Sequence, residues 1–172
     1  MFLIISFVFL QLFSLILHKT QKHTDPSTLS NYGTVTISNL RGIFNVNFER
    51  KIIEGNITFL LHSEEQGEEI IFDSKKLEVL KIFDCLNRTE LPFDFGEESE
   101  ALGRALIIKK TFGKNESLCL NILYETKEEG NAVSFLSKEQ TMGKEYPMVF
   151  THCEMILARE MMPCQDSPSV KC

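Results

Sequence analysis

The most specific pattern of residues in this sequence is the stretch THCEMILAREMMPCQDSPSVKC, residues 151–172. Glu154 follows Thr151 by three residues, and Arg159 stands five residues after Glu154. A Pro-Cys-Gln-Asp-Ser-Pro segment then begins at Pro163. Taken alone, Glu154 is interpreted as an exposed acid at the end of a strand, because carboxylates are rarely buried without a partner.

The Pro-Cys-Gln-Asp-Ser-Pro segment is typical of a structural turn. Pro163 and Pro168 each fix the backbone angle φ, and the carboxylate of Asp166 between them can accept hydrogen bonds from turn N–H groups. Arg159 is close enough in sequence to pair with Asp166 across the turn. We therefore predict a structural role for the set Arg159, Pro163, Cys164, Asp166 and Pro168.

Other catalytic chemistry finds little support in the sequence. The four histidines are His18, His23, His62 and His152, and none has a Ser or Cys partner that the sequence itself places nearby. There is no H-E-x-x-H pair to bind zinc, no C-x-x-C pair and no glycine-rich phosphate loop. We expect no catalytic residue and no metal ligand in this chain.

Length and composition indicate one globular domain. The chain has 172 residues, of which 43% are hydrophobic and 24% charged, and a domain of about 150 residues buries roughly 68–70% of its unfolded surface. Its net charge is -6. This excess of acid argues against a nucleic-acid partner, because phosphate binding requires a surplus of Lys and Arg on one face.

The N-terminal residues form an apolar leader. Residues 1–17, MFLIISFVFLQLFSLIL, contain only three polar side chains and are just long enough to span a bilayer core. They lack the basic start and small-residue cleavage site of a secretory signal peptide. A signal peptide, a short membrane anchor and a mistranslated leader remain open. We favour an uncleaved or poorly cleaved signal-type segment over residues 1–19, which predicts a secreted or membrane-tethered chain.

Sequons and cysteines bear on the same question. Three N-x-S/T sequons begin at Asn56, Asn87 and Asn115 and are candidate glycosylation sites. The five cysteines are an odd number and widely spaced, which does not suggest a disulfide scaffold. The sequence favours buried thiols.

Alternation of apolar and polar residues predicts an all-β fold. Phe44, Val46 and Phe48 share the buried face of a predicted half-buried strand, and Arg50–Gly55 joins it as a hairpin to a second strand. In that second strand the same alternation places Ile57, Phe59 and Leu61 on the buried face. Three further strands are predicted, from KKLEVLKIFDC, with Leu77, Val79, Lys81 and Phe83 alternating, and from ALGRALIIKKTF and SLCLNILYET. The last two are predicted to pair as a hairpin around Gly113–Glu116. No amphipathic helix follows the leader, so we expect a β-sandwich-like domain over residues 32–172.

The last third of the chain carries a more specific pattern. The sequence from Ser137 to Lys171 resembles the N-terminal domain of zinc aminopeptidases of peptidase family M1, most closely the branch containing leukotriene A(4) hydrolase and aminopeptidase B. The matching residues, in family order, are Gln140, Thr141, Gly143, Lys144, Pro147, Phe150, Thr151, Glu154, Arg159, Pro163, Cys164, Asp166, Pro168 and Lys171. A weaker likeness extends back to Thr34.

This resemblance implies a saddle-shaped β domain that caps a separate catalytic zinc domain. In such enzymes the zinc acts as a Lewis acid and activates water. By position, Glu154 would hold the substrate's free α-amine through a charge-assisted hydrogen bond. His152 stands where the family usually has Gln, which puts its substrate contact in doubt. The branch usually has Gln in place of Glu154, so this carboxylate favours peptide amines over a lipid epoxide.

The resemblance also implies what is expected to be missing. The sequence stops before any zinc ligand and before the last strands of the β domain, so this chain alone is expected to be inactive, with zinc only in full-length relatives. The alternatives are a non-catalytic secreted or tethered module that binds a peptide or protein partner, and an inactive remnant. A cytoplasmic location, as in the resembled branch, also stays open.

Overall fold

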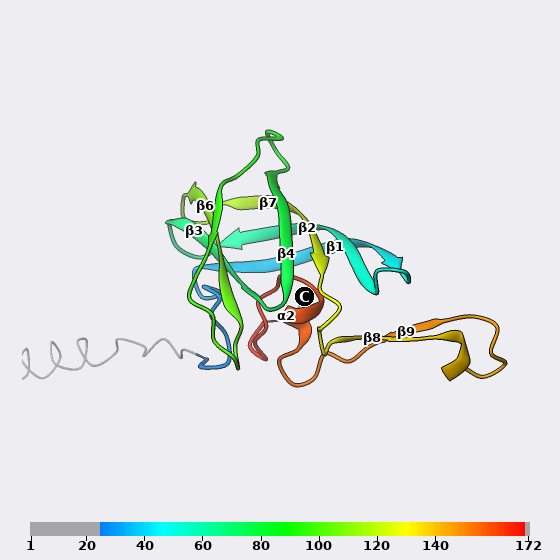
Figure 1. The fold of residues 1–172 in the computed structure, drawn as a ribbon. Coiled ribbons are helices and arrows are strands. Elements are labelled where there is room, and N and C mark those ends of the chain that lie inside the picture. The colour runs from blue at the N-terminus through cyan, green and yellow to red at the C-terminus, as the bar shows by residue number, and fades with distance from the viewer. Residues whose placement is uncertain (1–24, 171–172) are drawn as a thin grey trace, which may run out of the picture.

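The computed structural model describes residues 25–170, in which strands dominate (Figure 1). The elements are β1 (Val35–Asn47), β2 (Ile52–Ser63), β3 (Gly67–Ser74), β4 (Leu77–Asp84), β5 (Phe93–Phe95), β6 (Arg104–Phe112), β7 (Ser117–Thr126), β8 (Val133–Leu136), the 3-10 helix η1 (Lys138–Gln140), β9 (Met148–Thr151) and the helix α2 (Ala158–Met161). The expected leader, residues 1–19, lies outside the described residues.

The strands form two main antiparallel sheets and one small one. The larger sheet has the order β1-β2-β7-β4, the second has the order β3-β6-β5, and β8 pairs with β9. Alternate residues of β2, Ile57, Phe59 and Leu61, are buried, as the sequence predicts. The rings of Phe59 and Phe72, from different sheets, lie 4.9 Å apart at their centroids. The all-β prediction is confirmed, and the sheets do not form a closed barrel.

The turn of the first hairpin lies earlier than predicted. The bend covers Phe48–Lys51, and Gly55 lies within β2, where it pairs with Phe44 and with Tyr124 of β7. The reason for the glycine is steric, because a Cβ at this position would lie 2.3 Å from the Tyr124 ring. Gly55 therefore lets the ring lie against the strand and is not a turn residue.

The apolar residues at the end of β1 and at the start of the turn that follows it are more exposed than predicted. Phe44, Val46 and Phe48 are 37%, 39% and 40% exposed. Phe44 and Val46 share a face with the buried Ile57, but they lie outside the core cluster between the sheets. Phe48 packs edge-on against Phe135 of β8, with ring centroids 5.9 Å apart. The alternation in the sequence correctly identified which residues share a face of the strand. Whether that face is buried depends on how far the opposite sheet extends over it.

Two other predictions fail for reasons of register and topology. A bulge between Val79 and Lys81 breaks the alternation of β4, so that Ile82 is buried and Lys81 is exposed. The strands β6 and β7 belong to different sheets, so they do not form the predicted hairpin. Their connection crosses from one sheet to the other, and Ser63 Oγ donates to the carbonyl of Gly113 in this loop over 2.6 Å.

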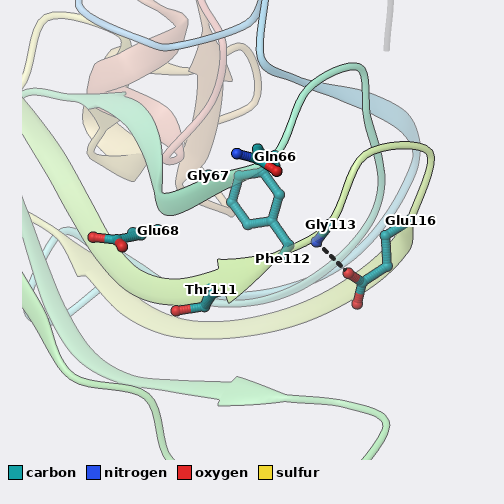
Figure 2. A pocket seen from close by; sticks show the side chains of 7 residues that line it. All are labelled: Gln66, Gly67, Glu68, Thr111, Phe112, Gly113 and Glu116. Carbon is teal, nitrogen blue, oxygen red and sulfur yellow. Dashed lines mark hydrogen bonds between the residues drawn. The ribbon is translucent and has the colours of Figure 1, made fainter.

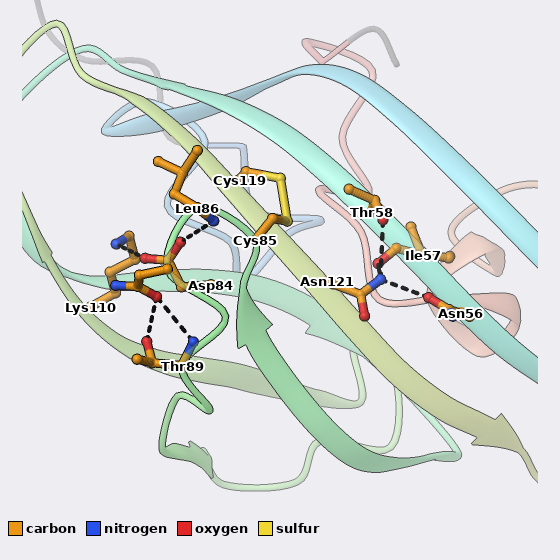
Figure 3. The surroundings of a disulfide bond; sticks show 11 residues. Asn56, Ile57, Thr58, Asp84, Cys85, Leu86, Thr89, Lys110, Cys119 and Asn121 are labelled. Atoms are coloured by element: carbon orange, nitrogen blue, oxygen red, sulfur yellow. Dashed lines mark hydrogen bonds and ion pairs between the residues drawn. A yellow bond between two sulfur atoms is a disulfide. The ribbon is translucent and has the colours of Figure 1, made fainter.

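Cys85 and Cys119 form a disulfide, which corrects the expectation of buried thiols for these two residues (Figure 3). Asp84 of β4 is paired with Leu120 of β7, so the antiparallel register brings Cys85 opposite Cys119, with Cα atoms 5.3 Å apart. Cys153 and Cys164 are thiols. Cys172 lies outside the described residues.

An ion pair anchors the residue that precedes this disulfide. Lys110 Nζ lies 2.6 Å from Asp84 Oδ2, and Leu86 N donates to Asp84 Oδ1 over 2.9 Å. Burial raises the pKa of Asp84, but these hydrogen bonds outweigh it, so the pKa lies below its ordinary value of 3.8. Because the folded-state pKa is the lower one, the pair stabilises the fold above about pH 4 and loses this effect as the pH falls through the folded value.

Replacing Asp84 with Asn should lower the free energy of unfolding by about 1–2 kcal/mol near pH 7, since Lys110 loses a charged acceptor. The difference from the unmodified chain should shrink below about pH 4. Urea unfolding followed by circular dichroism, at neutral and acidic pH, measures both effects. Glu90→Gln is the control, because Glu90 pairs with Lys81 on the surface at 3.7 Å. A constant difference at all pH values would contradict the assignment.

No helix within residues 25–170 is long and apolar enough to cross a membrane.

Candidate substrate-amine site

The Pro-Cys-Gln-Asp-Ser-Pro segment closes the sandwich between its two main sheets. Cys164 forms a two-way backbone bridge with Asp73 of β3, with N···O distances of 2.7 and 3.2 Å. The side-chain amide of Gln165 meets β1 of the other sheet: it accepts from Ile37 N over 3.1 Å and donates to the Val35 carbonyl over 2.6 Å. The segment therefore joins the sheets through hydrogen bonds that neither sheet supplies itself.

Arg159 lies at the centre of a buried polar network and is fully buried. Its Nε donates to Asp166 Oδ2 over 3.0 Å, so the expected pairing of these two residues is present. Its Nη1 lies 3.4 Å from Asp73 Oδ1, which adds a second carboxylate. Nη1 also donates to the Leu102 carbonyl over 2.9 Å, and Nη2 donates to the carbonyls of Ser27 over 2.6 Å and Asp166 over 3.2 Å. The guanidinium thus has charged and neutral acceptors around its plane.

Asp73 is the residue that sequence reasoning missed. Its carboxylate also accepts from Leu29 N over 2.7 Å, from Asp166 N over 2.9 Å and from the Thr28 hydroxyl. The segment that precedes β1 is thereby joined to the C-terminal turn. In the sequence Asp73 is the first residue of the polar run DSKK at the end of a strand. No local pattern indicates that it faces Arg159, a buried arginine 86 positions later in the chain.

The helix α2 is held on its other side by Glu160. This buried carboxylate accepts from Asn131 N over 2.5 Å and lies 3.3 Å from Lys75 Nζ. Tyr124 OH donates to the carbonyl of Met161 over 2.9 Å. Burial raises the pKa of Tyr124, so this hydroxyl keeps its proton. One turn of helix is therefore fixed by side chains on two sides.

Glu154 lies on the turn between β9 and α2, directly before this fixed helix. The turn is closed by Leu157 N, which donates to the Cys153 carbonyl over 3.1 Å, and the Glu154–Met155 peptide bond is cis. Glu154 is exposed, and no hydrogen bond or ion pair within residues 25–170 engages its carboxylate. The acid is thus available to a ligand while its backbone is held at both ends.

The neighbours of Glu154 divide between anchoring and exposed side chains. Cys153 points inward, with its Sγ 3.9 Å from Met161 Sδ, and burial, followed by the negative charge of Asp166, raises the pKa of the thiol. His152 is exposed and is fixed through its backbone N–H, which donates to the Ala132 carbonyl over 2.9 Å. His152 and Glu154 therefore flank an anchored residue, and both side chains are accessible.

A separate hollow of about 560 Å³ lies at another part of the fold (Figure 2). The residues that line it are Gln66, Gly67, Glu68, Thr111, Phe112, Gly113 and Glu116. None of the predicted site residues borders it. In Figure 2 the Phe112 ring lies over Gly67, and Gly113 N donates to Glu116 Oε2 over 2.7 Å.

Within the described residues no group of three or more His, Cys, Asp or Glu side chains is placed to hold a metal ion.

A sequence profile of the Peptidase M1 N-terminal domain matches residues 39–172. The chain belongs to peptidase family M1. This confirms the resemblance seen in the sequence, and the match includes the Glu154 turn and the residues Asp73, Arg159 and Asp166.

Relatives and solved structures agree with this assignment. Leucine aminopeptidase 2-2 of Scheffersomyces stipitis is 36% identical over 148 residues, which cover 86% of this chain and 23% of that protein. Leucine aminopeptidase 2 of Aspergillus fumigatus is 32% identical over 152 residues, which cover 86% of this chain and 24% of that protein. The structure of yeast LTA4 hydrolase with bestatin matches 89% of this chain and 24% of that chain, with a TM-score of 0.81 and 31% identity.

A more distant M1 zinc metallopeptidase, from Deinococcus radiodurans, shares the fold alone. The match covers 80% of this chain and 30% of the Deinococcus radiodurans chain, with a TM-score of 0.58 and 13% identity. The chain spans about a quarter of the length of the curated relatives that it matches. In the M1 family this segment is the N-terminal domain.

Proposed function

We propose that this chain is the substrate-recognition and capping domain of a zinc aminopeptidase, with residues 32–172 forming the domain. In this proposal Glu154 holds the free α-amine of a peptide, and His152 borders the same site. A catalytic domain on another segment supplies the zinc and the activated water. The chain by itself is inactive in this proposal, because its sequence contains no H-E-x-x-H pair to bind the zinc.

The observation that carries the proposal is the Glu154 turn. Its carboxylate is exposed and has no partner within residues 25–170, while the backbone before and after it is fixed. A carboxylate positioned in this way can make a charge-assisted hydrogen bond to an ammonium group without reorganising. That bond gains strength once a second domain covers the site and excludes water.

Exposed apolar side chains near this turn support a covering domain. Met148 and Phe150 of β9 are 48% and 46% exposed, and β9 leads directly to Glu154. Phe48, the first residue of the turn after β1, contacts Phe135 of the same hairpin. Figure 1 shows the β8–β9 hairpin projecting from the sandwich. Apolar surface gathered in this way is typical of a protein interface.

The same surface favours a second candidate function, a non-catalytic module that binds a peptide or a protein partner. The two candidates differ in whether a catalytic domain belongs to the same polypeptide. An inactive remnant is the third possibility, and it predicts a short-lived product.

The size and metal content of the native polypeptide test these candidates. An antibody against the exposed segment Gly143–Phe150 would be used to isolate it, and zinc and aminopeptidase activity would be measured on the same band. A band far larger than 19.7 kDa with zinc and activity is expected. A stable band near 19.7 kDa without zinc would overturn the capping role and support the non-catalytic module. A band that is rapidly degraded would support the remnant.

For the compartment, we propose that the chain enters the secretory pathway, where the leader would also allow membrane contact. The Cys85–Cys119 disulfide supports this, because disulfides persist in oxidising compartments and are rare in the cytosol. The cytoplasmic alternative predicts reduced thiols at these two positions.

A further inference from the structure

The three sequons lie in different structural settings. Asn56 is in β2, which is hydrogen-bonded to β1 on one side and β7 on the other. Its Oδ1 accepts from Asn121 Nδ2 over 2.6 Å, and the Thr58 hydroxyl also accepts from Asn121 Nδ2, over 3.1 Å. In a strand, residues i and i+2 are roughly 6.6 Å apart. The carboxamide and the hydroxyl of this sequon are therefore held apart by the sheet.

The Asn115 sequon is also divided between two elements. Asn115 lies in the β6–β7 connection with φ of 59°, and its N–H donates to the Ser63 carbonyl over 2.9 Å. Ser117 is already the first residue of β7 and pairs with His62. No hydrogen bond joins the Asn115 and Ser117 side chains. Asn115 is exposed, but its sequon is not folded on itself.

The Asn87 sequon alone among the three is closed into a turn. Thr89 donates to Asn87 Oδ1 twice, from its N–H over 3.0 Å and from its hydroxyl over 2.6 Å. This Asx turn brings the hydroxyl against the carboxamide. Both residues are exposed. The Asn87 Nδ2 atom makes no hydrogen bond within the described residues, so it remains available for modification.

The surrounding loop is fixed so that this turn persists in the folded chain. Asp84 N donates to the Thr89 carbonyl over 2.9 Å, and Arg88 N donates to the Asp84 carbonyl over 2.8 Å. The disulfide of Cys85 with Cys119 fastens the start of the loop to β7. In Figure 1 the β4–β5 connection forms the upper tip of the molecule, away from the β8–β9 hairpin. A large group at this tip would leave the Glu154 turn uncovered.

We propose that Asn87 is an N-glycosylation site and the preferred acceptor among the three sequons. The co-reactant is an oligosaccharide linked to a lipid diphosphate. The bond from the sugar C1 to the diphosphate oxygen breaks, the bond from C1 to Asn87 Nδ2 forms, one Nδ2 proton leaves and the lipid diphosphate departs. The inference rests on the proposed secretory compartment and is independent of the aminopeptidase role.

The test uses the full 172-residue chain, with its own N-terminal residues, expressed in a eukaryotic cell. Enzymatic deglycosylation in heavy-oxygen water converts each glycosylated Asn to labelled Asp, which peptide mass spectrometry then locates. We expect the Asn87 peptide mainly in the glycosylated form and the Asn56 peptide mainly unmodified. Thr89→Ala should abolish the modification at Asn87, and Thr89→Ser, which keeps the hydroxyl, should retain it.

The same digest, analysed without reduction, reports the Cys85–Cys119 disulfide. A formed disulfide with unmodified Asn87 would overturn the glycosylation proposal and leave the compartment standing. Free thiols at both positions with unmodified Asn87 would overturn the compartment and the glycan together. Occupancy mainly at Asn56 or Asn115 would overturn the choice of acceptor.

Discussion

Replacing Arg159 with Met should lower the free energy of unfolding by about 3–5 kcal/mol, because it leaves uncompensated charge in a buried network. The side chains of Arg159 and Asp73 are both 0% exposed, and that of Asp166 is 14% exposed. Without the guanidinium, two carboxylates face each other across the C-terminal turn. Chemical denaturation of the full chain, followed by circular dichroism, measures the loss.

Arg159→Lys keeps this prediction testable if the Met variant does not fold. Lysine keeps the charge but not the planar set of donors, so its stability should fall between those of the unmodified chain and the Met variant. Arg50→Met is the matched control. Arg50 Nη2 lies 2.6 Å from Glu125 Oε2, but its side chain is 55% exposed, and surface pairs contribute little. If Arg159→Met were as stable as Arg50→Met, the buried network would not hold the turn.

Replacing Glu154 with Ala should lower kcat/KM for unblocked peptides by about 10–100-fold, the effect of losing one hydrogen bond to a charged group. This prediction applies to the native polypeptide that carries both this domain and a catalytic domain. The backbone of the turn is held by Cys153 and by α2, so the substitution should remove the carboxylate without unfolding the domain. Steady-state kinetics on a series of dipeptide amides measures the change.

A substrate variant makes this prediction specific for the amine. Analogues that lack the α-amino group should be poor substrates of the unmodified enzyme, and Glu154→Ala should reduce that discrimination, as in a double-mutant cycle. Glu145→Ala, which removes another exposed acid before β9, should leave the discrimination unchanged. Equal discrimination by the Glu154 variant and the unmodified enzyme would contradict the assigned role.

The sequence by itself determined the fold class and the family, and it predicted the residues of the candidate site. Alternation over short segments depends on the strand period of two, which is local, so Ile57, Phe59 and Leu61 are buried as predicted. The order and spacing of the C-terminal motif are also read directly from the chain. The Arg159–Asp166 pair is a contact between residues seven positions apart, and it too could be predicted.

Only the tertiary structure decided which distant residues meet. Asp73, Gln165 and the partner of Cys85 are each fixed by strand pairing and by the packing of two sheets, which no local pattern encodes. The assignment of β6 and β7 to different sheets has the same origin. The exposure of Phe44 and Val46 depends on where the core ends, because a strand specifies its faces while its neighbours determine which face is covered.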